Sequence, residues 1–124
     1  MLALDEKDAR ACNAPMPRFA LLEHDWPALH LDLLLEAGAA CWTWRLPSFP
    51  NRGESCSAER IADHRLAYLD YEGPVSGGRG SVRRVDCGTF VLLEASPERV
   101  AVRLMDGAMA GRLVLEEGRA TRCE

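Results

Sequence analysis

The segment HLDLLLEAGAACWTWRLP, residues 30–47, decides the fold class of this chain. Its first part alternates in polarity, with a leucine at every second position from residue 31. A period of two is typical of a β-strand that buries one face. Gly38 ends this run, and a second strand-like run with two tryptophans closes at Pro47. The short link at 37–39 predicts a hairpin.

Further strand-like segments lie on both sides of this hairpin. RFALLEH at 18–24 is a short apolar run, and SVRRVDCGTFVLLEA at 81–95 is interpreted as two strands around Cys87-Gly88. Residues 99–124 continue as three strands separated by turns, whereas a short helix is plausible at 56–66. Short strands at regular spacing predict a mainly β protein, either a barrel or a sandwich.

Length and composition indicate one small soluble domain. The chain has 124 residues, 48% of them hydrophobic and 27% charged, which is ordinary for a globular protein. The net charge of −4 leaves no broad basic field for a long stretch of nucleic acid. We expect residues 1–16 to be a flexible extension and residues 17–124 to form the domain.

The cysteines indicate a reducing compartment. The five of them are widely spaced, odd in number and without a C-x-x-C pair, which argues against a disulfide framework or a zinc knuckle. The N-terminal residues carry acidic side chains before any apolar run, unlike a signal peptide, and no apolar stretch reaches the roughly 20 residues of a membrane helix. We therefore expect a cytoplasmic protein that does not enter a membrane.

The segment EHDWPALHLD, residues 23–32, holds two of the three histidines. On a strand, His30 and Asp32 share a face because side chains alternate. A turn at Trp26-Pro27 would fold His24 back toward them. Two imidazoles and a carboxylate suit Mn²⁺, Zn²⁺ or Fe²⁺, and they disfavour Mg²⁺. The competing interpretation is an ordinary polar face of a surface strand.

Several other segments allow two interpretations. Trp42 and Trp44 share a strand face and fit either core packing or a base-stacking platform. SGGRG at 76–80 fits a tight hairpin turn better than a phosphate cradle. Asp25 could orient a histidine or cap its turn. The minority interpretation of Asp70 or Glu72 as a catalytic acid also stays open.

Three segments together resemble a known family. They are RFALLEHDWPALHLDLLLEAGAACWTWRLP, then DHRLAYLDYEG, then GRGSVRRVDCGTF. They follow the motifs H-D-x-x-x-L-H-x-D-L-R-L-E, S-W-A-V-P-K-G, E-D-H-P-L-x-Y-x-D-F-E-G and G-x-G-x-V-x-x-W-D-x-G-T of the 3′-phosphoesterase domain of bacterial DNA ligase D. The match covers about residues 18–90, in order and with the expected separations.

The resemblance implies a compact β-barrel with short flanking helices and a Mn²⁺-dependent activity in DNA repair. In that family the enzyme removes a terminal ribonucleoside and then the 3′ phosphate, which implies 3′ ends of DNA or RNA–DNA primer-templates as partners. It also implies a separate ligase or polymerase chain, since those domains are absent here. The metal ligands fall on His24, His30 and Asp32, and catalytic roles fall on His64 and Tyr68.

The chain departs from the family at its cations. The arginine of H-x-D-x-R is Leu34 here, and the lysine of V-P-K-G is Ser48. Candidate substitutes for phosphate binding are Arg45, Arg65 and Arg84, the last within a cluster that also holds Arg79 and Arg83. Alternation places Arg45 opposite in direction to Trp44, and it points Arg83 and Arg84 to opposite faces.

Three hypotheses of function follow from these features. The first is a metal-dependent 3′-phosphoesterase. The second is a module on the same fold that keeps the metal, has weakened catalysis and binds nucleic acid ends. A plain β-domain without metal is the third and least supported.

Overall fold

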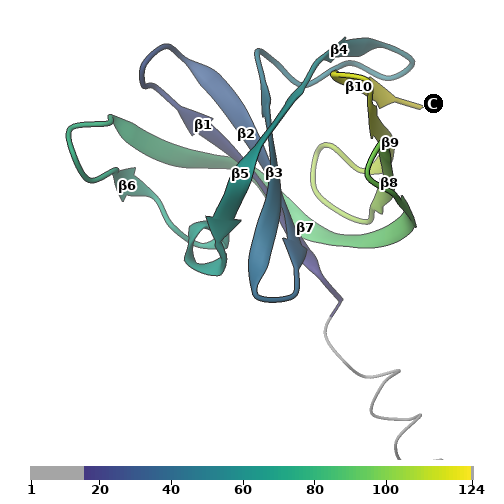
Figure 1. Cartoon of the computed structure of the whole chain (residues 1–124), viewed down its shortest axis with the longest axis horizontal. Coiled ribbons are helices and arrows are strands. Elements are labelled where there is room, and N and C mark those ends of the chain that lie inside the picture. The colour runs from purple at the N-terminus through teal and green to yellow at the C-terminus, as the bar shows by residue number, and fades with distance from the viewer. Residues whose placement is uncertain (1–15, 124) are drawn as a thin grey trace, which may run out of the picture.

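The computed structural model describes residues 16–123, which hold ten strands and one short 3-10 helix (Figure 1). The extension expected over residues 1–16 lies outside this range, apart from Met16. The elements are β1 (Arg18–His24), β2 (His30–Ala37), β3 (Ala40–Leu46), β4 (Ser55–Ser57), β5 (Glu59–Arg65), η1 (Leu66–Leu69), β6 (Gly73–Pro74), β7 (Ser81–Ala95), β8 (Arg99–Leu104), β9 (Gly111–Glu116) and β10 (Arg119–Arg122).

The strands form one antiparallel sheet in the order β4-β10-β9-β8-β7-β1-β2-β3-β5, and β6 pairs with β7. Strand β7 crosses the molecule, because its first half pairs with β1 and its last half with β8 (Figure 1). The prediction of two strands at 81–95 is therefore wrong. Gly88 does not end a strand: it lets β7 pass close to Asp106, whose carboxylate accepts a hydrogen bond from the Thr89 amide at 2.7 Å.

The mainly β, single-domain class is confirmed, but the sheet is not closed into a barrel. Its two ends, β4 and β5, pair only with β10 and β3, and Ala58 alone separates them along the chain. The helix considered at 56–66 is wrong, since both of these strands occupy that segment. Within residues 16–123, η1 is the one helical element, and no helix there is long and apolar enough to cross a membrane.

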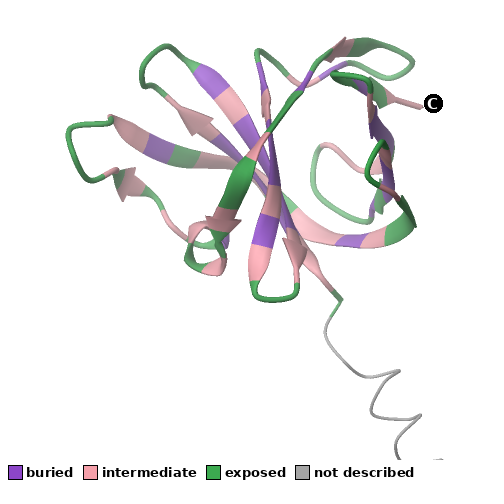
Figure 2. Ribbon diagram, viewed as in Figure 1, coloured by how far each residue is buried: buried purple, intermediate pink, exposed green. Residues whose placement is uncertain are grey.

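Two apolar clusters lie on opposite faces of the strands β1, β2 and β3. The larger cluster is the main core between the two halves of the sheet, and it includes Leu33 and Leu35 of β2. A smaller cluster on the other face contains the following side chains: Ala20, Leu22, Leu34, Cys41, Leu69 and Val82. Strand β2 is thus buried on both faces along its middle (Figure 2).

The β2–β3 hairpin is confirmed and aligns the residues that matter for the site. Gly38 has a φ of +72° in its turn, a conformation that glycine adopts without strain. The register places Asp32 opposite Arg45. On the other side of β2, His30 lies opposite His24 of β1. The smaller cluster therefore continues along the strands into a group of polar side chains.

Candidate metal centre

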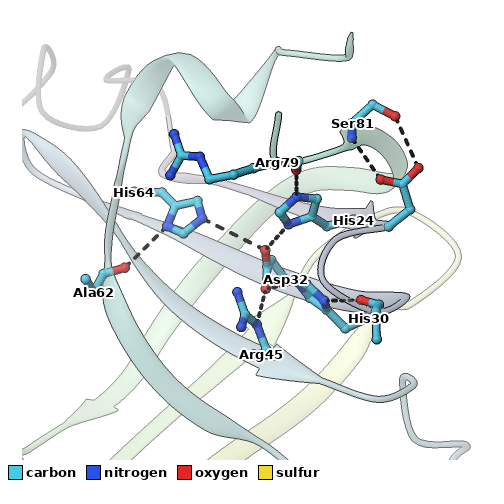
Figure 3. A network of polar contacts seen from close by, with 10 residues as sticks. His24, His30, Asp32, Arg45, Ala62, His64, Arg79 and Ser81 are labelled. Carbon is cyan, nitrogen blue, oxygen red and sulfur yellow. Dashed lines mark hydrogen bonds and ion pairs between the residues drawn. The ribbon is translucent and has the colours of Figure 1, made fainter. Parts of the chain in front are cut away.

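Asp32 lies at the centre of the polar group and is 1% exposed. It follows His30 by two positions on β2, so both side chains leave the same face of the sheet. His24 ends β1, and its ring meets that of His30 edge to face with centroids 4.9 Å apart. The predicted approach of these three residues is therefore present in the fold (Figure 3).

Nitrogen atoms from two histidines and one arginine surround the Asp32 carboxylate. His30 Nε2 lies 3.4 Å from Oδ1, and His24 Nδ1 lies 3.9 Å from Oδ2. Arg45 Nε lies 3.6 Å from Oδ1. One ligand atom from each of His24, His30 and Asp32 lies within 4.8 Å of the others. This spacing is compact enough for the three side chains to share one ion.

Backbone carbonyls determine which histidine nitrogens face the carboxylate. His24 donates from Nε2 to the Arg79 carbonyl, and His30 donates from Nδ1 to the Ala28 carbonyl, both at 2.8 Å. In a neutral imidazole the second nitrogen is then an acceptor. Two acceptor nitrogens and an ionised carboxylate thus point at one another, an arrangement that a bound cation stabilises.

Three buried atoms of this group have no hydrogen-bond partner among the described residues: the pair of possible ligand atoms His30 Nε2 and Asp32 Oδ1, and the donor Arg45 Nε. Buried polar atoms normally have partners, so an unpartnered pair calls for an explanation. A divalent metal provides one, since it would bond to both atoms at once. The residues present therefore fit a metal ion, and imidazole with carboxylate suits several divalent transition metals.

His64 and Tyr68 lie beside this centre. The β3–β5 pairing puts His64 opposite Cys41 and its Nε2 3.9 Å from Asp32 Oδ2. Its Nδ1 donates to the Ala62 carbonyl at 3.3 Å, which leaves Nε2 directed toward the centre (Figure 3). Tyr68, on η1, contacts the His64 ring edge to face at 5.5 Å.

A cavity of about 370 Å³ opens over the centre, and it is lined by His24, Asp32, His64 and Tyr68. Its other charged lining residues are Arg45, Arg65, Arg79 and Asp63. Three arginines around one cavity make it suitable for an anion. Of the arginines proposed for phosphate binding, the fold brings Arg45 and Arg65 to this cavity.

The fold does not bring Arg84 to the cavity. Its guanidinium donates to the Leu69 carbonyl at 3.0 Å and pairs with Asp70 at 3.4 Å. Arg83 points away from it and pairs with Glu23 at 2.9 Å. The third cavity arginine is instead Arg79, which the sequence analysis grouped with these two. Arg79 lies in the turn between β6 and β7, whereas Arg83 and Arg84 lie within β7.

Leu34 and Ser48 occupy the positions of the family's arginine and lysine, and neither side chain provides a positive charge. Leu34 is fully buried in the smaller apolar cluster, where an arginine would lose its hydration. Ser48 lies in the loop after β3 and accepts a weak hydrogen bond from Cys56 Sγ through its carbonyl. The positive charges that line the cavity therefore come from arginines at positions other than those of the family motifs.

Several motif residues have structural contacts. Asp86 accepts hydrogen bonds from the Ala108 and Met109 amides, which holds the β8–β9 loop. The glycine-rich segment is a hairpin turn, closed by a bond from the Val75 amide to the Gly80 carbonyl. Asp25 accepts from the Ser81 amide at 2.8 Å, so its side chain joins its turn to the start of β7, and it neither caps its own turn nor orients a histidine.

Asp70 and Glu72 lie outside the cavity and do not fit a catalytic acid there. Arg18 donates to the Asp70 carboxylate and lowers its pKa below the usual range, so this group stays ionised at neutral pH. Glu72 accepts from the Arg84 amide at 2.8 Å. Both side chains stabilise the segment that joins η1 to β6.

Comparison with known proteins agrees with this geometry. A family model described as the DNA ligase D 3′-phosphoesterase domain matches residues 22–117. The matched range contains every residue of the polar group and of the cavity. No curated protein matches the chain.

Proposed function

Since the chain belongs to the DNA ligase D 3′-phosphoesterase family, we propose that it is a metal-dependent enzyme that trims the 3′ ends of nucleic acid strands. The observation that carries this proposal is the convergence of His24, His30 and Asp32 with two buried ligand atoms left unpartnered. A metal held there would suit phosphoester cleavage, because it would stabilise the charge that develops on the phosphoryl oxygens.

The metal of this proposal is Mn²⁺, with Zn²⁺ as the alternative. His24 Nδ1, His30 Nε2 and an Asp32 oxygen would hold it, which leaves positions for water and substrate. A bound divalent ion polarises a phosphoryl oxygen and lowers the pKa of a water molecule. The carbonyls of Arg79 and Ala28 keep the two imidazoles in the tautomers that such binding requires.

His64 is the proposed proton donor. Its Nδ1–H is engaged by the Ala62 carbonyl, so a protonated ring presents its second proton at Nε2 toward the cavity. Histidine changes charge near neutral pH, and a positioned acid speeds proton transfer by about 10²- to 10⁴-fold. Tyr68, packed against this ring, would donate a hydrogen bond from its hydroxyl group to a phosphate oxygen and keep its proton.

Arg45, Arg65 and Arg79 are the proposed phosphate ligands, because all three line the cavity. A guanidinium can donate two parallel hydrogen bonds to a phosphate. The substrates in this proposal are 3′ ends of DNA or of RNA–DNA primer-templates. A separate ligase or polymerase chain would then use the trimmed end.

A second candidate function is end binding with weakened catalysis. It is favoured by Leu34, whose full burial excludes the family's cation from that position. The protein would then bind a metal and a 3′ end without releasing product. The two candidates make opposite predictions for turnover and the same prediction for metal binding.

The test offers the purified protein with Mn²⁺ a primer-template that ends in a ribonucleotide or a 3′ phosphate. We expect stepwise removal of the terminal nucleoside and of the phosphate. His30→Ala should lose both metal binding and trimming. His64→Ala should keep metal binding, measured by calorimetry, and trim about 10²- to 10⁴-fold more slowly.

Metal binding without turnover on either end would reject the enzyme and favour the end-binding module. Trimming that persists in His30→Ala would reject the metal centre. Asp32→Asn is a further control, because it keeps the shape and removes the charge. At 100 times the dissociation constant, Mn²⁺ should stabilise the wild type by about 2.7 kcal/mol and leave this variant unchanged.

A further inference from the structure

The turn between β1 and β2 carries an exposed indole at the edge of the cavity. Trp26 is 44% exposed, and it lines the same cavity as His24 and Asp32. Its ring therefore combines an open aromatic face with a position at the edge of a polar cavity, where a ligand in the cavity could contact it.

This indole stands on a firmly held turn. The Asp25 carboxylate accepts hydrogen bonds from the amide and hydroxyl of Ser81, at 2.8 and 3.5 Å, and its amide donates to the Ser81 carbonyl. Gly80 approaches so closely that an added Cβ would lie 2.7 Å from Trp26 Cβ. The turn therefore holds the indole's backbone without help from a ligand, and a ligand pays little ordering entropy there.

The other two tryptophans are engaged in packing. Trp44 is 5% exposed in the main core, and Trp42 packs against that core. The Arg60 guanidinium lies over both rings, 5.3 Å from the Trp42 centroid and 4.5 Å from the Trp44 centroid. The base-stacking role considered for this pair is thus better suited to Trp26.

We propose that Trp26 is the stacking platform for the nucleobase whose sugar carries the phosphoester in the cavity. The inference rests on the proposed function and adds a residue that positions the substrate. A nucleotide joins an anion to a flat aromatic base, and this cavity joins three arginines to an exposed indole. Every base offers such a face, so the platform accepts any terminal base without reading its identity.

The kinetic test compares two primer-templates that differ only in the terminal base: one ends in a normal ribonucleotide, the other in an abasic ribose. Trp26→Ala should raise KM about 5- to 150-fold for the normal end and leave kcat and the abasic end unchanged. Trp26→Phe should recover most of the affinity, because it keeps an aromatic face.

Leu29→Ala is the matched control, since Leu29 is an exposed apolar residue of the same turn that lies outside this cavity. It should leave both substrates unaffected. An equal loss on both ends with Trp26→Ala, or no loss on either, overturns the platform.

A binding measurement separates this inference from the proposed function. Adenosine 3′-phosphate should quench the Trp26 fluorescence of the Zn²⁺-loaded protein, inorganic phosphate should not, and Trp26→Phe should show no quenching. Quenching without any turnover supports the platform and rejects the enzyme. Turnover without quenching by the nucleotide rejects the platform and leaves the enzyme standing.

Discussion

Arg45 is the proposed phosphate ligand that lies beside the candidate metal centre: its Nε lies 3.6 Å from Asp32 Oδ1 and its side chain lines the cavity. Arg45→Gln removes the charge and keeps a polar side chain. We expect kcat/KM for a phosphodiester to fall about 10²-fold, the effect of losing one donor to a developing anion. Mn²⁺ affinity should not fall, since Arg45 competes with the metal for Asp32.

Steady-state hydrolysis of bis(p-nitrophenyl) phosphate measures this effect. Arg83→Gln is the control, because Arg83 pairs with Glu23 away from the cavity. It should keep its rate within about twofold, as exposed ion pairs contribute little. Equal rates for Arg45→Gln and the wild type would show that Arg65 and Arg79 bind the phosphate without it.

Cys41 makes stability depend on alkaline pH. It is fully buried beneath the polar centre, and burial raises the pKa of its thiol from 9.0 to about 11. Between these values the unfolded thiol loses its proton while the folded one keeps it, so stability falls as pH rises from about 9 to about 11. Urea unfolding across this range should show a steeper decline for the wild type than for Cys41→Ala. Parallel declines would contradict the assignment.

At the scale of elements, the β6–β7 hairpin supports the turn that carries Trp26. Gly80 has a φ of +73°, and an added Cβ would lie 2.2 Å from Asp25 Oδ1. Gly78 has a φ of +69° in the same hairpin with nothing within 4 Å. Gly80→Ala should therefore displace the β1–β2 turn, and Gly78→Ala should add backbone strain alone.

The expected result is weaker Mn²⁺ binding in Gly80→Ala than in Gly78→Ala, because the hairpin also supplies the Arg79 carbonyl that orients His24. Calorimetric titration of both variants measures the difference. Equal affinities would show that the histidine keeps its orientation without this contact between the two turns.

The same elements explain what the sequence could predict about the fold. The β2–β3 hairpin was predictable because β2 alternates and Gly38 marks the turn. The strand in the segment 56–66 was not predictable. β5 is an edge strand with most of its residues exposed, so its sequence shows no alternation of apolar and polar residues that would indicate a strand. Pairing with β3 overrides the helix propensity of its alanine, glutamate and arginine residues.

The site was predictable where it depends on neighbours in sequence. His30 and Asp32 meet through strand alternation, and His24 joins them across one turn. His64 could be placed only by family resemblance, because it arrives on β5 through long-range pairing. Separating Arg79 from Arg84 required the fold, since the β6–β7 hairpin decides which of them faces the cavity.

At the scale of the whole molecule, the two apolar clusters have different structural roles. The main core joins the two halves of the sheet, and β7 runs through both halves as a continuous strand. The smaller cluster lies beneath the polar centre, and η1 covers it through Leu69. Global stability therefore depends mainly on the first cluster, and the geometry of the centre depends on the second.

A matched pair of leucine truncations separates these two dependences. Leu113, in the main core, and Leu34, in the smaller cluster, are 1% and 0% exposed, so Leu113→Ala and Leu34→Ala should each destabilise the protein by about 2–5 kcal/mol. Only Leu34→Ala should also weaken Mn²⁺ binding at a temperature where both variants are folded, because Leu34 and Asp32 share a face of β2. Urea unfolding and calorimetric titration measure the two effects. A similar loss of metal affinity in Leu113→Ala would mean that the geometry of the metal centre also depends on packing in the main core, so that the two clusters are not independent.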